Sequence, residues 1–262
     1  MKPISLAGWS LNRRFRRVEN PLQLADFPRV AREEFGIMAI ELNEPFFPST
    51  EEAYLKELVR IAEGEGVKML NIAIDRQGNL SAPDPTERRR AVENHRRWFE
   101  VAATLGCNAI RANTGGHGEP VTEDLLQRCS ESFAALAEAG EQAGIYILIE
   151  NHGGISAYPD NILRILREVD NPWLGTLPDF GNFPPEVDRY AALEKIAPYA
   201  RAVHAKMFEF DERGEETTID IGRCVRILQE AGYTGHFGIE FEGPGGDHEG
   251  VLKAKALLER YL

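Results

Sequence analysis

Residues 144–154 read GIYILIENHGG, a short apolar run that ends in a glutamate and a Gly-Gly loop. The run is rich in β-branched residues and follows a glycine, so it predicts a buried strand over Tyr146–Glu150. A strand of this kind is typical of a parallel sheet in an α/β protein. The stretch therefore places Glu150 at the carboxyl end of a buried strand.

The same pattern recurs along the chain. Strands are predicted at Ile4–Gly8, Ile37–Leu42, Val67–Ile74, Ala109–Asn113, Tyr146–Glu150, Leu174–Pro178, Ala202–Lys206 and Phe237–Phe241, with amphipathic helices at about residues 21–35, 51–64, 85–105, 122–143, 160–169, 186–197, 219–231 and 247–261. Alternation of strand and helix predicts βαβ units and a parallel sheet.

Eight units in 262 residues predict a single (β/α)8 TIM barrel domain over residues 1–262. A doubly wound open sheet is the alternative architecture. The first predicted strand is not followed by a Gly-x-Gly-x-x-Gly turn, which disfavours that alternative. No composition shift or linker divides the chain.

The formal net charge of −12 disfavours binding to the phosphate backbone of nucleic acids. The sequence contains no apolar run of the length that spans a membrane, and its arginine-rich beginning is not followed by the apolar segment of a signal peptide. Three scattered cysteines suit a reducing compartment. These features predict a cytoplasmic protein that binds a small molecule, without nucleic-acid or membrane partners. A homo-oligomer is compatible with them.

Polar residues close the last four predicted strands: Glu150, Asp179, His204 and Glu240. Since barrel active sites are built at the carboxyl ends of strands, consecutive strands should bring these residues together. Their oxygen and nitrogen donors predict a site for one divalent metal ion, with Mn²⁺ favoured and Mg²⁺, Co²⁺ or Zn²⁺ as alternatives. Burying three carboxylates without a cation is costly, which favours a metal site over four unrelated structural roles.

At these residues the sequence resembles the xylose-isomerase-like barrels, a family of sugar isomerases and epimerases that includes D-tagatose 3-epimerase, hydroxypyruvate isomerase and inosose dehydratase. The resemblance covers the whole chain in architecture, but the residue-level match lies in the four strand-end segments. It implies that Glu150, Asp179, His204 and Glu240 bind the metal. It also implies that Glu150 and Glu240 act as an acid/base pair on either side of the reacting carbon.

The implied reaction is isomerisation or epimerisation of a small sugar, keto-sugar or polyol. A proton next to a carbonyl is removed, and the metal stabilises the resulting enediolate. The chain departs from the ketose epimerases at Asn182, where they usually carry a histidine, and at Phe210, where they carry an arginine. The segment IENHGGIS also differs from the EPxN form of hydroxypyruvate isomerases. The substrate and the reaction therefore stay open.

Other residues that follow the predicted strands are candidates for contacts with substrate. His152 lies two residues beyond Glu150 and is a catalytic candidate, because its imidazole could protonate a leaving hydroxyl; a hydrogen bond that supports the loop is the alternative. Lys206 shares a strand face with His204 and could bring positive charge to the reacting oxygen, unless it is a surface lysine. The remaining candidates for substrate binding are Trp9, Glu41, Asn43, Arg111, Asn113, His117 and Asn182, while Asn71 and Asp75 near the end of the third predicted strand could equally be structural.

The segment EGPGGDHEG, residues 242–250, bears on whether the substrate is phosphorylated. Gly245 and Gly246 could form a backbone nest for an anion at a helix start. Asp247 would instead cap the helix with its own carboxylate. The second interpretation favours an unphosphorylated sugar.

Three other functions compete with an isomerase or epimerase. A metal-dependent lyase or dehydratase of a keto-sugar or keto-inositol would begin with the same proton abstraction and use His152 as an acid. A non-catalytic sugar-binding barrel would keep the metal set for structure alone. An abasic-site endonuclease would need more metal-binding histidines than these strand ends supply, and the net charge opposes it.

Overall fold

A computed structural model describes residues 2–262. The strands are β1 (Ile4–Ala7), β2 (Ala39–Asn43), β3 (Lys68–Ile74), β4 (Ala109–Ala112), β5 (Tyr146–Glu150), β6 (Leu174–Leu177), β7 (Val203–Met207) and β8 (Phe237–Phe241). The helices are α1 (Asn12–Phe15), α2 (Phe27–Phe35), α3 (Glu52–Glu65), α4 (Pro85–Leu105), α5 (Glu123–Ala143), α6 (Pro159–Val169), α7 (Arg189–Ile196), α8 (Ile221–Glu230) and α9 (Asp247–Tyr261). This alternation confirms the predicted α/β class.

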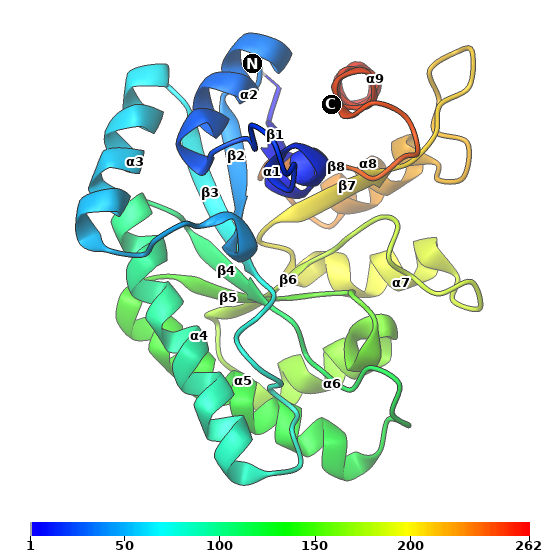
Figure 1. The fold of residues 1–262 in the computed structure, drawn as a ribbon. Helices are drawn as coiled ribbons and strands as arrows, with labels where there is room; N and C mark the ends of the chain where they lie inside the picture. Colours follow the sequence, from blue (N-terminus) through cyan, green and yellow to red (C-terminus); the bar gives the residue numbers. More distant parts are fainter. Residues whose placement is uncertain (1) are drawn as a thin grey trace.

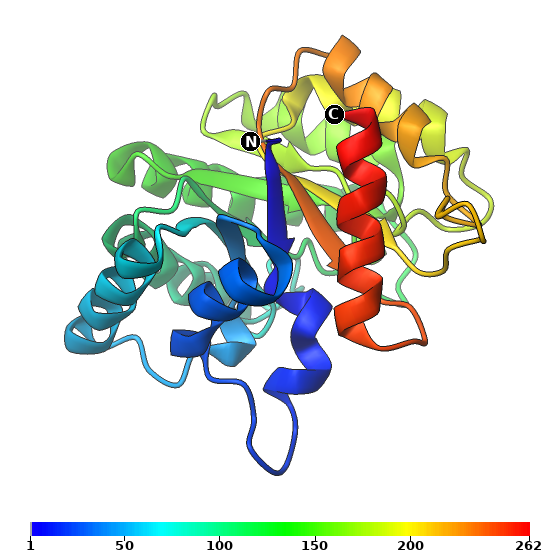
Figure 2. The same cartoon turned by 90° about the horizontal axis from the view of Figure 1, so that it is seen from above.

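The eight strands form one parallel sheet in the order β6-β5-β4-β3-β2-β1-β8-β7. The sheet curls, and the helices lie around its outside (Figure 1). Isolated parallel bridges, Thr176 to Ala200 and Asp179 to His204, join the segments of β6 and β7 at the two ends of this order. Figure 2 shows α9 beside β8 and β1, so the last helix covers the junction of the first and last strands.

Apolar packing occurs on both sides of the sheet. The larger cluster fills the space between strands and helices and includes Phe27, Phe133 and Phe237. A smaller cluster is formed by Ala109, Leu148, Leu177 and Ala202, which lie two residues before Arg111, Glu150, Asp179 and His204, respectively. The polar site is therefore held above an apolar layer.

One helix begins later than the sequence predicts. The expected helix covers residues 21–35, but the chain forms a 3-10 turn at Leu24–Asp26 and α2 begins at Phe27. Gln23 has extended backbone angles, φ −86° and ψ 147°, so a helix cannot run through it from residue 21. Pro28 lacks an N–H and is tolerated in the first turn of α2.

No helix within residues 2–262 is both long and apolar enough to cross a membrane. All three cysteines are buried and unbridged. Burial raises the pKa of the Cys224 thiol to about 12, so this sulfur is held as an unreactive thiol.

Acid should weaken the fold through His95, which is buried in α4 with its Nδ1 2.8 Å from the carbonyl oxygen of Ala91. Burial, assisted by the charge of Arg111, lowers the pKa of His95 to about 4 from 6.5. Below pH 6.5 the unfolded chain binds a proton at His95, whereas the folded chain leaves this histidine neutral down to about pH 4. The free energy of unfolding therefore decreases as the pH falls from 6.5 toward 4. We expect wild type to lose about 2 kcal/mol more than His95→Gln between pH 7 and pH 5.

Urea unfolding at the two pH values measures this difference, and exposed His117→Gln serves as the control. Equal losses in wild type and His95→Gln would show that this histidine does not couple folding to pH.

Candidate metal and substrate site

Glu150, Asp179, His204 and Glu240 come from β5 to β8 and meet at one site: Glu150 ends β5, Asp179 follows β6 by two residues, and His204 and Glu240 lie within β7 and β8. One ligand atom from each lies within 4.8 Å of the corresponding atoms of the other three. All four side chains are buried. The structure thus brings together the residues that the strand ends predicted as a metal set.

The loop after β6 fixes the carboxylate of Asp179. Its Oδ1 accepts hydrogen bonds from the backbone N–H groups of Gly181 and Asn182, at 2.7 and 2.8 Å. The side chain of Asn151 makes two hydrogen bonds to the backbone of Asp179. Its Oδ1 accepts from the Asp179 N–H at 2.7 Å, and its Nδ2 donates to the Asp179 carbonyl oxygen at 2.9 Å. Within residues 2–262 the other oxygen, Oδ2, is buried and accepts no hydrogen bond, although Lys206 Nζ lies 3.8 Å away, so its lone pairs can bind a cation.

His204 connects the carboxylates through both ring nitrogens. Nδ1 lies 3.0 Å from Glu150 Oε1 and 3.5 Å from Glu240 Oε1, while Nε2 lies 3.2 Å from Glu41 Oε2. Glu41 is itself held by Ser5 and Asn71, at 2.6 and 2.9 Å. A carboxylate on the far nitrogen of a histidine orients its other nitrogen toward a metal.

Glu41 therefore lies behind His204. The sequence predicted a substrate contact there, but Glu41 is buried and does not line the pocket described below. Its carboxylate is engaged by His204, Ser5 and Asn71. These contacts suit a residue that positions the metal set.

Buried charges at the site shift the proton affinities in opposite directions. Burial, with repulsion from Glu240 and Glu150, raises the pKa of Asp179 well above its ordinary value. Burial also opposes ionisation of Glu150, but the charges of Arg111 and His204 outweigh it and lower the pKa of Glu150. Burial disfavours the charged His204 ring, yet Glu240 and Glu150 raise its pKa well above the ordinary range. Protons on Asp179 and His204 thus offset the repulsion among the buried carboxylates, and a bound cation would offset the same repulsion.

The donor set fits a divalent metal ion. Glu150 Oε2, Asp179 Oδ2 and Glu240 Oε2 are buried oxygens without an aligned hydrogen-bond donor within residues 2–262. Two of them have a cation at 2.9 Å, Arg111 Nε beside Glu150 and Lys206 Nζ beside Glu240, but without hydrogen-bond alignment. Oxygen-rich donors with one imidazole suit Mn²⁺, Mg²⁺ or Zn²⁺.

Lys206 is a buried residue of the site. It pairs with Glu240 across β7 and β8 in the sheet register, so both side chains point to the same side. Nζ also lies 3.4 Å from Glu242 Oε2 and donates to Asn182 Oδ1 at 2.8 Å. The alternative of a surface lysine is wrong, because the side chain is only 5% exposed.

A polar cavity of about 200 Å³ opens above this set. Its lining residues are Trp9, Arg16, Asn43, Pro45, Asp75, Arg76, Arg111, Asn113, His152, Lys206, Glu240 and Glu242. Among the residues predicted to contact substrate, Glu41, His117 and Asn182 are not in that lining, and of the metal set only Glu240 reaches it. His117 is exposed, and Asn182 bridges Lys206 to Glu150, with its Nδ2 3.4 Å from Glu150 Oε1.

Four lining residues had no predicted site role: Arg16, Pro45, Arg76 and Glu242. Glu242 follows Glu240 by two residues, so the alternation of a strand was a signal for it. Arg16 and Arg76 lie on loops and Pro45 lies in a one-turn 3-10 helix, and none of these segments has a periodic pattern. Only the folded loops bring them to the cavity.

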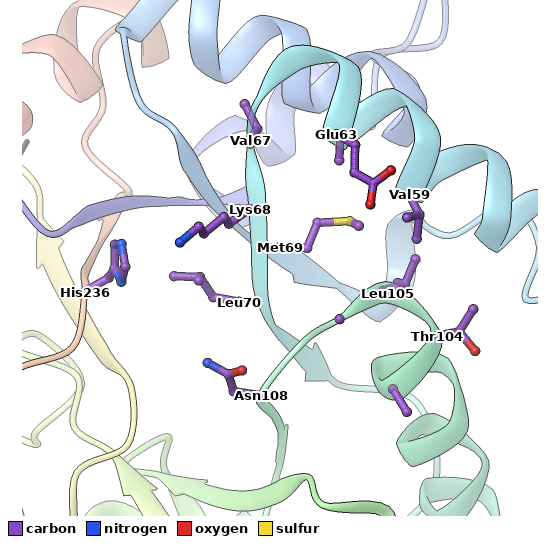
Figure 3. Close-up of a pocket in the computed structure, with 13 residues that line it drawn as sticks. Val59, Glu63, Val67, Lys68, Met69, Leu70, Thr104, Leu105, Asn108 and His236 are labelled. Carbon is purple, nitrogen blue, oxygen red and sulfur yellow. The ribbon is translucent and has the colours of Figure 1, made fainter.

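A larger cavity of about 570 Å³ lies at the opposite end of the strands. Figure 3 shows Lys68, Asn108 and His236 on one side of it, and Met69 directed toward Val59 and Glu63 on the other. This cavity lies near the starts of β3, β4 and β8, away from the metal-ligand set, in which Glu150 ends β5 and Asp179 follows β6. Barrel chemistry belongs to the carboxyl ends, so the smaller cavity is the candidate active site.

Residues 29–261 match a family model described as xylose isomerase-like TIM barrel. The chain belongs to this family. L-ribulose-5-phosphate 3-epimerase UlaE from Escherichia coli is 23% identical over 208 residues, which cover 75% of this chain and 72% of that protein. A second relative, the C-glycoside deglycosidase alpha subunit of Microbacterium trichothecenolyticum, is 44% identical over 48 residues, but these cover only 18% of this chain and 13% of the relative.

Several solved structures share the fold of this chain. L-ribulose 3-epimerase superposes with a TM-score of 0.81 at 18% identity, covering 100% of this chain and 95% of that one. The IOLI protein with a binding zinc atom gives a TM-score of 0.79 at 16% identity, covering 100% and 99%. The structural neighbours include sugar epimerases.

Proposed function

We propose that this chain is a divalent-metal-dependent isomerase or epimerase of a small sugar, keto-sugar or polyol. The observation that carries the proposal is the buried set of Glu150, Asp179, His204 and Glu240 beneath a polar cavity. The similarity to UlaE and to L-ribulose 3-epimerase supports it, as both of those proteins are sugar epimerases.

Glu150, Asp179, His204 and Glu240 would hold the metal. When bound, a divalent cation stabilises the negative charge that develops on sugar oxygens as a neighbouring carbon loses its proton. Mn²⁺ is our first choice, with Mg²⁺, Co²⁺ or Zn²⁺ as alternatives. Zn²⁺ stays in this group because the solved IOLI protein binds a zinc atom.

Glu150 and Glu240 would take and return the proton at the reacting carbon. Their strands, β5 and β8, stand on either side of Asp179 and His204 in chain order, so a substrate between them would present one face to each. Lys206 and Arg111 would donate to the sugar oxygens from the cavity wall. Trp9 would provide an apolar surface for the sugar ring.

A metal-dependent dehydratase is the second candidate. Its specific support is His152, which lines the same cavity and could protonate a departing hydroxyl. In either case we infer a single domain whose sheet closes into a complete barrel, since the bridges at Thr176 and Asp179 already join its two ends. A cytoplasmic location stays a prediction.

Incubation of metal-loaded protein with ketoses in D₂O, followed by NMR, tests the proposal. We expect deuterium at the carbon next to the carbonyl, together with an epimer or isomer as product. Loss of water would favour the dehydratase. No exchange with any neutral or acidic ketose would overturn both enzymatic functions in favour of a binding protein.

A further inference from the structure

Two arginines at the cavity have no acidic partner within residues 2–262. Arg16 directly follows α1 and Arg76 comes from the loop after β3, and both line the cavity above the metal set. Both are exposed. Within residues 2–262, neither guanidinium has a carboxylate at ion-pair distance or a side-chain hydrogen bond.

The other cations of the cavity are matched by acids. Arg111 lies 2.7 Å from Asp75 and 2.9 Å from Glu150. Lys206 lies 2.9 Å from Glu240 and 3.4 Å from Glu242. The positive charges of Arg16 and Arg76 are therefore the ones that no acid of the cavity balances.

Aromatic packing holds one of these arginines at the cavity without neutralising it. The Arg16 guanidinium lies 4.5 Å from the centroid of the Trp9 ring and 6.0 Å from that of Phe46. Trp9 is itself stacked on Phe46 at 6.0 Å. A cation–π contact orients a guanidinium while it keeps its full charge and its N–H donors.

The glycine-rich loop before α9 is occupied by other contacts. Arg13 donates to the carbonyl oxygens of Gly243 and Gly245 at 2.6 and 2.8 Å, and Asp247 pairs with Arg14 at 2.7 Å. The sequence predicted Asp247 as the helix cap, but the cap position is Gly246 and carries no side-chain bond. Asp247 therefore does not cap α9, and this loop gives no reason to prefer an unphosphorylated sugar.

We infer that the substrate is an acidic sugar whose phosphate or carboxylate group binds Arg16 and Arg76 at the cavity. The inference rests on the proposed function for the sugar part of the ligand, and on the two arginines for the acidic part. A chain of net charge −12 repels anions at long range, so local guanidinium donors are what an anionic group requires here. Phosphate and carboxylate share the bidentate geometry that arginine recognises.

Titration calorimetry with matched sugars tests the inference on metal-loaded protein. The dissociation constant of D-ribose 5-phosphate is compared with that of D-ribose, and the constant of D-glucuronate with that of D-glucose. Inorganic phosphate is titrated as an anion without a sugar. We expect at least one acidic sugar to bind about tenfold or more tighter than its neutral partner, and the preferred pair identifies the acidic group. Arg16→Gln and Arg76→Gln should each remove about tenfold of the affinity for that sugar and lower the affinity for its neutral partner by a much smaller factor.

Arg17→Gln is the matched control, because Arg17 is exposed on the same loop as Arg16 and is not part of the cavity lining. Metal content and melting temperature of each variant report on folding. Equal binding of acidic and neutral sugars, absence of binding by all the anionic probes, or equal losses in Arg17→Gln and the two cavity variants would overturn the acidic-sugar inference. Failure of the proposed function appears separately, as absence of metal or of deuterium exchange.

Discussion

Replacing Glu150 or Glu240 by glutamine should lower turnover by about 10² or more, because glutamine keeps the shape and an oxygen ligand but cannot accept the proton. Both carboxylates are buried next to His204, with Nδ1 3.0 Å from Glu150 and 3.5 Å from Glu240. Sugar binding should survive better than turnover, since the wall residues of the cavity stay in place. Product formation and deuterium wash-in, measured on the same active sugar, separate the two effects.

The two variants should also differ from each other. In an epimerase, one variant should still exchange a substrate proton from the face whose base remains intact. In a dehydratase, one of the two glutamates should act as the base. His152→Ala should then lower turnover as much as replacement of that glutamate does. Glu119→Gln, on an exposed loop, is the control for the same chemical change. Near-wild-type rates in both variants would rule out the acid/base assignment even with a full complement of metal.

Removal of the metal should lower the melting temperature of wild type by about 5–10 °C when the free ion is about 100-fold above its Kd. Chelation leaves Glu150, Asp179 and Glu240 as buried carboxylates without their cation. Asp179→Asn and His204→Ala should lose the bound metal and with it the sensitivity to chelator. Elemental analysis and thermal melts with chelator, then with added Mn²⁺, measure both quantities.

Glu41→Gln should have a milder effect on the same measurements. Glu41 contacts His204 Nε2 at 3.2 Å and lies behind the ligand set, so we expect its loss to weaken metal affinity by about 10- to 100-fold. Asp160→Asn, which changes an exposed aspartate in α6, is the control.

Wild-type metal content in both Asp179→Asn and His204→Ala would refute the metal site.

Local sequence signals were enough to predict the α/β class, the eight strands and the four residues of the candidate metal set. Strands such as Tyr146–Glu150 carry their own signal, because a short β-branched run is buried on both faces and stops at the polar residue that closes it. Alternation along a strand also links His204 to Lys206. Since these signals are local, they could be read without knowing which strands are neighbours.

The contacts of those residues follow only from the folded chain. Glu41 is a strand-end glutamate like Glu150, but only the curled sheet places it on the far nitrogen of His204, away from the cavity. Arg16 and Arg76 lie on loops that are 60 residues apart in sequence, and no periodic pattern joins them. Charge interactions depend on distance through space and on burial, and neither quantity is encoded in spacing along the chain.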